Sequence, residues 1–258
     1  ATCRRRARTS RATWRRSNEG LMDKVVESLA TNGSDTVYCG TRNSLHRSTD
    51  SGANWLRIVL CQRSSSNIIS RGLSVGPAGD VLFAGDSLIR STDGGDTWRS
   101  AGVNGVFMTV MARNSKGHLF VGHSEGLYRS LNNGQTWASI EGGLTSRRVN
   151  AICFNASDHI FVGGAWGIGD GVFRSTNNGD TWTRLVEGYC GTSVSVIASL
   201  RSGTVLASGN FRTTDKGLSW LTTTDSSYFS FLVPDIQGRL WTAFAGGVSF
   251  STDEGSSW

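Results

Sequence analysis

The sequence has only two prolines, no apolar run long enough to cross a bilayer, and, outside residues 22–30, no stretch with helical periodicity. Its cysteines are odd in number and include no Cys-x-x-Cys pair, so neither a zinc site nor a complete disulfide framework is indicated. The glycines separate short apolar runs instead of opening a helix, which excludes a phosphate-cradling loop. The sequence therefore predicts no membrane span, no metal and no cofactor.

Positive charge is concentrated at the beginning of the chain. Residues 1–16 contain seven arginines and no acid, so the formal net charge of +6 becomes −1 for the remainder. The body of the protein is therefore not a basic platform for nucleic acid. We expect a basic segment over residues 1–13, in which the arginine cluster, with Arg15 and Arg16 just beyond it, could bind phosphate or an acidic partner. The alternative is a solvated tail.

An octapeptide of the form Ser-x-Asp-x-Gly-x-x-Trp, or a close variant, recurs along the chain. We call it the octapeptide motif. Successive motif tryptophans are 43, 39, 45, 38 and 38 residues apart, and a period near forty residues indicates a repeat architecture. The six copies are Ser48–Trp55, Ser91–Trp98, Ser130–Trp137, Ser175–Trp182, Thr213–Trp220 and Ser251–Trp258.

Each motif is suited to a tight turn between two strands. An Asp or Asn side chain accepts hydrogen bonds from backbone N–H groups further along, glycine supplies a positive φ, and the Trp can pack between neighbouring units. Asn replaces Asp in two copies, which argues against a required carboxylate. We therefore assign structural roles to Asp50, Asp93, Asn132, Asn177, Asp215, Asp253, Trp55, Trp98, Trp137, Trp182, Trp220 and Trp258.

The rest of each period contains short apolar or alternating runs separated by glycine-containing turns. Residues 106–140 show four such runs, and the following periods repeat the pattern. Four antiparallel strands per repeat of about forty residues is the sequence signature of a β-propeller blade. We therefore predict an all-β fold, a β-propeller of four-stranded antiparallel blades.

At this point the chain resembles the Asp-box proteins, also called bacterial neuraminidase repeat proteins. That family includes sialidases, sortilin-type receptors, xyloglucanases and a propeller that assists photosystem II assembly. The resemblance covers residues 14–258 and implies a single propeller domain, and it favours an exported or cell-surface protein. It does not select a function, because enzymes, receptors and assembly factors share the motif.

The blade count follows from the ends of the repeats. Thr13-Trp14 matches the end of a motif, and Trp14 lies one period before Trp55. The chain therefore predicts six blades, with Trp14–Asn18 as the outer strand that completes the last blade. The alternative is that the chain is a fragment of a longer propeller.

Two departures from the repeat pattern are candidate binding sites. The fourth repeat extends a turn to residues 163–171, which adds Trp166, a possible stacking platform, and Asp170. The long connection over residues 61–72 adds Arg63 and Arg71. The alternative for Trp166 is that it folds back onto its own blade.

The arginine-bearing Phe/Tyr-Arg-Ile-Pro motif of sialidases is missing, since the two prolines follow Gly76 and Val233. No other pattern places a catalytic residue. We therefore predict a non-catalytic scaffold that binds a protein or carbohydrate ligand. The alternative is a diverged or incomplete glycoside hydrolase of sialidase-like or xyloglucanase-like type. The oligomeric state stays open.

Overall fold

The fold was determined as a computed structural model. It describes residues 15–42, 44–58, 72–85, 87–104, 107–140, 142–144, 148–165, 171–189, 193–208, 211–223, 231–235, 237–244 and 247–258. These residues form 23 strands. No helix capable of spanning a membrane occurs among them.

Strands that follow one another in the chain pair antiparallel within six sheets. The first is β1 (Val26–Thr31), β2 (Val37–Thr41), β3 (Leu45–Ser48) and β4 (Leu56–Ile58). The second is β5 (Gly72–Val75), β6 (Val81–Ala84), β7 (Leu88–Ser91) and β8 (Arg99–Ser100). The third is β9 (Met108–Arg113), β10 (Leu119–His123), β11 (Gly126–Ser130) and β12 (Ala138–Ile140).

The second half of the chain repeats the arrangement. The fourth sheet is β13 (Arg148–Phe154), β14 (Ile160–Ala165), β15 (Val172–Ser175) and β16 (Thr183–Leu185). The fifth is β17 (Ile197–Ser199), β18 (Val205–Ala207), β19 (Phe211–Thr213) and β20 (Leu221–Thr222). The sixth is β21 (Phe231–Pro234), β22 (Leu240–Phe244) and β23 (Gly247–Ser251).

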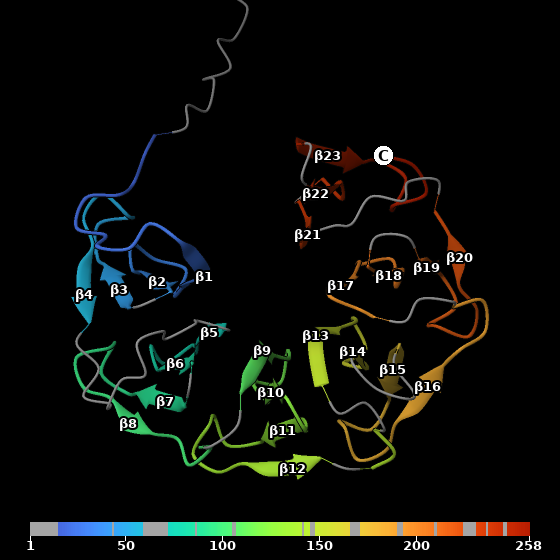
Figure 1. The fold of residues 1–258 in the computed structure, drawn as a ribbon, viewed down its shortest axis with the longest axis horizontal. Coiled ribbons are helices and arrows are strands. Elements are labelled where there is room, and N and C mark those ends of the chain that lie inside the picture. Colours follow the sequence, from blue (N-terminus) through green and yellow to red (C-terminus); the bar gives the residue numbers. More distant parts are fainter. Residues whose placement is uncertain are drawn as a thin grey trace, which may run out of the picture.

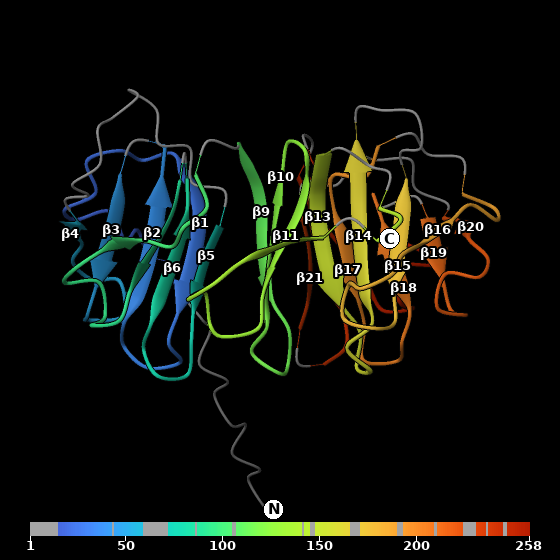
Figure 2. The ribbon, with the colours of Figure 1, turned by 90° about the horizontal axis from the view of Figure 1, so that it is seen from below.

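The six sheets are the blades of a β-propeller. Figure 1 shows them arranged around a central axis, with the first strand of each blade innermost and the last at the rim. The side view shows a flat disc whose hairpin turns emerge on two opposite faces (Figure 2). The all-β, six-bladed fold predicted from the repeats is thereby confirmed.

The expected closure of the last blade differs in the structure. The sixth sheet has three described strands, and residues 15–18 lie outside any strand. Ser17 instead bonds the carbonyl of Gly52, and the indole Nε1 of Trp55 donates to the Ser17 carbonyl at 3.0 Å. These contacts place the segment against the first blade, not the sixth. Trp14 and the basic segment lie outside the described residues.

The apolar core lies between blades rather than within one layer. In one cluster Phe120 of the third blade packs with Ile160 and Phe173 of the fourth. The inner strands of consecutive blades also lie against one another, from β1 and β5 through to β17 and β21. Blade-on-blade packing therefore supplies most of the buried apolar surface.

Candidate functional site

Each octapeptide motif turns the chain between the third and fourth strands of a blade. In the second copy, the Ser91 hydroxyl donates to Asp93 Oδ1 at 2.7 Å and accepts from the Gly95 N–H at 2.7 Å. Asp93 Oδ1 also accepts from the Thr97 N–H at 2.9 Å. Asn132 accepts in the same way from the Thr136 N–H at 2.9 Å. The amide oxygen therefore makes the same turn bond as the carboxylate oxygen.

The motif also holds one backbone feature that the sequence does not signal. The residue before the motif glycine is left-handed as well, including the non-glycine residues Lys216 (φ 64°) and Glu254 (φ 58°). The glycines that follow them have φ 87° and 82°. Two successive residues with left-handed backbone therefore form the turn, although only the glycine allows this conformation to be predicted from the sequence.

Hydrogen bonding within the motif lowers the pKa of its carboxyl groups. For Asp253, bonds from the Ser257 hydroxyl and N–H lower the pKa to about 2. For Asp215, burial opposes ionisation, but bonds from Ser219 and Thr213 still lower the pKa to about 2. Both groups are therefore ionised acceptors at neutral pH.

We expect acid to destabilise the protein through these carboxylates. Their folded pKa lies below the ordinary value, so their stabilisation is complete above about pH 4 and is lost as the pH falls through about 2. Urea unfolding from pH 6 to pH 2 should therefore show a smaller pH dependence for Asp215→Asn/Asp253→Asn, by close to one proton per carboxylate near pH 3. The converse variant, Asn177→Asp, should increase the pH dependence, and an unchanged slope in both variants would contradict this account.

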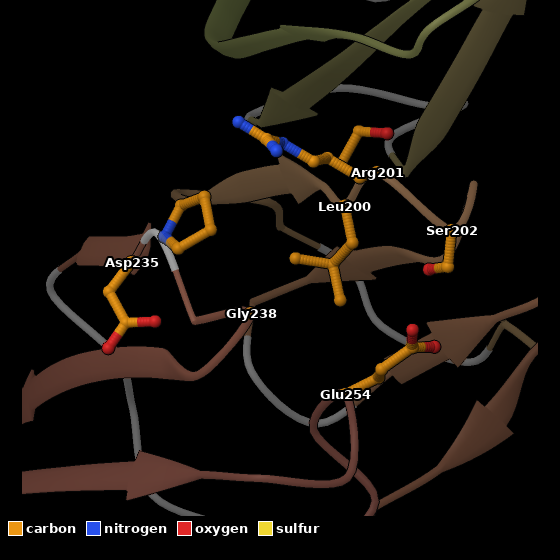
Figure 3. Close-up of a pocket in the computed structure, with 8 residues that line it drawn as sticks. Leu200, Arg201, Ser202, Asp235, Gly238 and Glu254 are labelled. Atoms are coloured by element: carbon orange, nitrogen blue, oxygen red, sulfur yellow. The ribbon is translucent and has the colours of Figure 1, made fainter.

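The turns between the first and second strands form a second set of loops, all on one face of the disc. A cavity of about 240 Å³ lies between the turns of the fifth and sixth blades. Leu200, Arg201 and Ser202 line it from the fifth blade, and Asp235 and Glu254 line it from the sixth. Figure 3 shows Leu200 between Asp235 and Glu254, with Arg201 along one edge.

Both carboxylates in this cavity are already bonded within the protein. Asp235 accepts from Arg239 Nε at 2.6 Å and from the Trp241 indole at 3.1 Å. Burial opposes its ionisation, but these bonds lower its pKa to about 2. Glu254 accepts from the Thr204 hydroxyl at 2.6 Å, and this bond, with Arg212 nearby, lowers its pKa. Both groups are therefore poor proton donors at neutral pH.

Arg201 is the charged group of the cavity that lacks an opposite charge. It is exposed, and it makes no ion pair with any residue in the described part of the chain. It also lines a neighbouring hollow of about 350 Å³ formed by the turns of the third, fourth and fifth blades, which include Asn114 and Asn155. One guanidinium thus serves two adjoining hollows on this turn face.

The sequence-based candidate binding residues lie elsewhere. Arg15 and Arg16 are exposed beside the first blade and do not line the cavity. Trp166, Asp170, Arg63 and Arg71 lie outside the described residues. Sequence reasoning missed the cavity around Arg201 because its walls come from two repeats. One signal was available: the fifth repeat has Leu200 where the neighbouring turns have Asn114, Asn155 and Asp235.

The described residues bring together no group of three or more His, Cys, Asp or Glu side chains that could hold a metal ion. Two of the histidines are buried in separate blades, His46 in β3 and His123 in β10, and burial lowers the pKa of both. Cys39 and Cys153 are free thiols in different blades. Among the described residues, these histidines and cysteines therefore form no candidate site besides the cavity of the turn face.

Comparison with known proteins supports the fold. No family model and no curated protein matches the sequence. The structure is similar to YCF48 bound to D1 peptide, with 15% identity, 93% of this chain and 82% of that chain covered, and a TM-score of 0.73. It is also similar to the GH74 xyloglucanase from Xanthomonas campestris, again with 15% identity, 93% of this chain covered and a TM-score of 0.73.

This chain covers only 47% of the length of that xyloglucanase. A third similar structure is YCF48 from Cyanidioschyzon merolae, with 17% identity, 84% of this chain and 79% of that chain covered, and a TM-score of 0.63. These likenesses place the chain in one structural class, the β-propellers. At such identities they show the fold alone.

Proposed function

We propose that this protein is a non-catalytic β-propeller scaffold that binds a polypeptide segment across the turn face around Arg201. The observation that carries the proposal is an exposed, unpaired guanidinium shared by two adjoining hollows. A planar guanidinium binds carboxylates through two parallel hydrogen bonds. An acidic side chain or a terminal carboxylate of the ligand would therefore bind Arg201.

The apolar contacts of the same cavity suit a peptide. Leu200 and Pro234 line it beside the polar groups, so a ligand can bury an aliphatic side chain next to its carboxylate. The carboxylates of Asp235 and Glu254 are bonded to Arg239 and Arg212, so they repel an anionic ligand less than free acids would. YCF48 bound to D1 peptide is a solved structure of similar fold with a peptide ligand, which supports a peptide as the ligand class.

The octapeptide motifs have a structural role in this proposal. Their Asp or Asn side chains are acceptors for hydroxyl and backbone groups of their own turn, as Asp93 is for Thr97. They lie between the third and fourth strands, and of the motif residues only Glu254, which is not one of these Asp or Asn side chains, lines the cavity in the described part of the chain. The motif thus builds the blades, and ligand recognition falls to the variable turns.

The test is binding of labelled decapeptides, one rich in Asp, Glu and Leu and one neutral, measured by fluorescence anisotropy. Arg201→Ala should weaken binding of the acidic peptide by about tenfold or more, because a charge-assisted hydrogen bond contributes roughly 1.5–3 kcal/mol. The control, Arg99→Ala, removes the same charge from an exposed residue of β8 and should have little effect. Equal losses in both variants, or no preference for the acidic peptide, would contradict the proposal.

The second candidate function is glycoside hydrolysis, favoured by the placement of Asp235 and Glu254 in one cavity. Paired carboxyl groups perform this reaction, and the general acid needs a raised pKa. The lowered pKa of both groups disfavours it. Release of reducing sugar from xyloglucan by the wild type, lost in Asp235→Asn and Glu254→Gln, would favour the enzyme over the scaffold.

A further inference from the structure

The first and sixth blades each present one face that has no neighbouring blade among the described residues. Figure 1 shows these two blades facing each other across an opening in the ring. The inner strands of all consecutive blades pack together, whereas β21 and β1 are not packed in this way. The two open faces therefore lack contacts that every other blade face has.

On the sixth blade, the open face carries a large side chain that is buried in every other blade. The second residue of each second strand points to the following blade. Trp241 holds this position in the sixth blade and is only half-buried. The five equivalents in the other blades are at most 2% exposed: Tyr38, Leu82, Phe120, Phe161 and Leu206.

The side chains around Trp241 extend this apolar surface. Val233 and Phe250 are its cross-strand neighbours, and they are 51% and 48% exposed. Phe231 and Val248, in the adjacent row, are 44% and 66% exposed. Four large exposed apolar side chains around one tryptophan on a single sheet face mark an interaction surface.

The first blade shows the complementary exposure. Leu29 occupies the position in the first strand that packs onto the preceding blade, and it is 63% exposed. Its equivalents all belong to interblade clusters: Leu73, Met111, Ile152, Ile197 and Leu232. The first blade therefore has the receiving surface of an interior blade without the preceding blade.

The internal interfaces show what fits between such faces. The motif glycine of each blade sits against the preceding blade, so closely that a Cβ on Gly134 would lie 2.6 Å from Leu82 and one on Gly255 would lie 2.3 Å from Leu206. Trp241 lacks a glycine of this kind opposite it in the described residues. At the first blade, a Cβ on Gly52 would meet Ser17 and the ring of Trp55 in its own motif but, among the described residues, no apolar side chain of another blade.

We propose that the two open faces bind one further antiparallel sheet of the same repeat type, from a partner segment outside residues 1–258. Such a sheet would set a motif glycine against Trp241 and an apolar side chain against Leu29, which continues the packing of the interior interfaces. Residues 15–18, which already lie on the first blade, would be its outer strand. A complete second copy does not fit, because a blade docked on Trp241 would bring its next blade onto the first blade of the ring.

The repeat itself supplies a sharp test. Residues 183–220 span one full period, from the outer strand of the fourth blade to the motif Trp220 of the fifth. A second copy of these residues added after Trp258 would supply the outer strand of the sixth blade and three inner strands of the new sheet. Closure should raise Tm by more than about 5 °C and reduce the binding of an apolar dye.

The control carries the same addition with Val205→Asp and Phe211→Asp in the added copy, at positions buried against the preceding blade. It should show neither effect. In the extended chain, Leu29→Ser should lower Tm, whereas in the 258-residue chain the same change of an exposed residue should leave it nearly unchanged. Equal Tm for the extended and original chains, an extended chain that fails to fold, or a dimer of the original chain abolished by Phe250→Ser would overturn the proposal.

Discussion

Replacement of Phe120 by Ala should lower the free energy of unfolding by about 3–5 kcal/mol, the largest loss we expect from a single core truncation. Phe120 is fully buried between the third and fourth blades, where its ring centroid lies 5.5 Å from that of Phe154. A Cβ on Gly179 of the next blade would lie 3.5 Å from the same ring, so the backbone of the fourth blade packs directly against Phe120. Truncation to Ala would therefore leave a cavity between the two blades. Thermal melts should show Tm lower by roughly 10 °C.

The matched control is Trp241→Ala, which truncates the equivalent residue of the sixth blade. Trp241 keeps a bond to Asp235 and a ring contact with Phe250, but it has no following blade against it in the described residues. Its loss should cost no more than about 2 kcal/mol, although the side chain removed is larger. A loss as large as that for Phe120→Ala would show that the face of Trp241 is covered in the 258-residue chain.

The repeat period made the fold predictable because every period contains the same local chemistry. Short apolar runs define the strands, and a glycine with positive φ, such as Gly95 at 94°, defines each turn. These are local signals, and the six-bladed propeller follows from their number and spacing. Closure was not predictable in this way, since it depends on whether residues 15–18, which lie on the first blade, also pair with the sixth blade, which is distant in sequence.

Contacts between blades were also beyond sequence reasoning, although one left a trace. The residue before the motif Ser or Thr is Arg in five repeats, and in four of them it donates to a carbonyl in the motif turn of the next blade. Arg47 donates to the carbonyl of Gly94 at 2.6 Å, and Arg174 does the same to Lys216 at 2.6 Å. The sixth repeat has Phe250 instead. The replacement of Arg by Phe250 is visible in the sequence, and it occurs in the one blade that has no following blade among the described residues.

The turn-face cavity shows the same limit for function. Arg201 is one exposed arginine among many in the sequence, and nothing local distinguishes it. Its place between two hollows depends on the turns of four blades, which only the ring brings together. Trp166 and Arg63 were selected from the sequence because insertions stand out in a repeat. A cavity lined by turns of different blades leaves no such signal in the sequence.

The second large effect should come from Gly188→Ala, in the connection that leads into the fifth blade. Gly188 has φ 73°, and a Cβ there would lie 2.3 Å from the backbone oxygen of Trp220. The Trp220 N–H donates to the Glu187 carbonyl at 3.0 Å, so the connection is bonded to the end of the motif and cannot move away without losing this bond. Left-handed strain of about 1–2 kcal/mol and overpacking of about 1–3 kcal/mol together predict a loss of about 2–5 kcal/mol.

Gly117→Ala separates the two causes. Gly117 has φ 83°, similar to that of Gly188, but a Cβ there would meet nothing within 4 Å. It should therefore show the backbone strain alone, about 1–2 kcal/mol, in urea unfolding at neutral pH. If both variants lose the same stability, the connection at Gly188 yields to the added methyl group and does not clamp the fifth blade. If Gly188→Ala loses clearly more, the close approach of the two backbones is what holds the connection, and Gly20, whose added Cβ would lie 2.1 Å from the Trp55 oxygen, should behave in the same way.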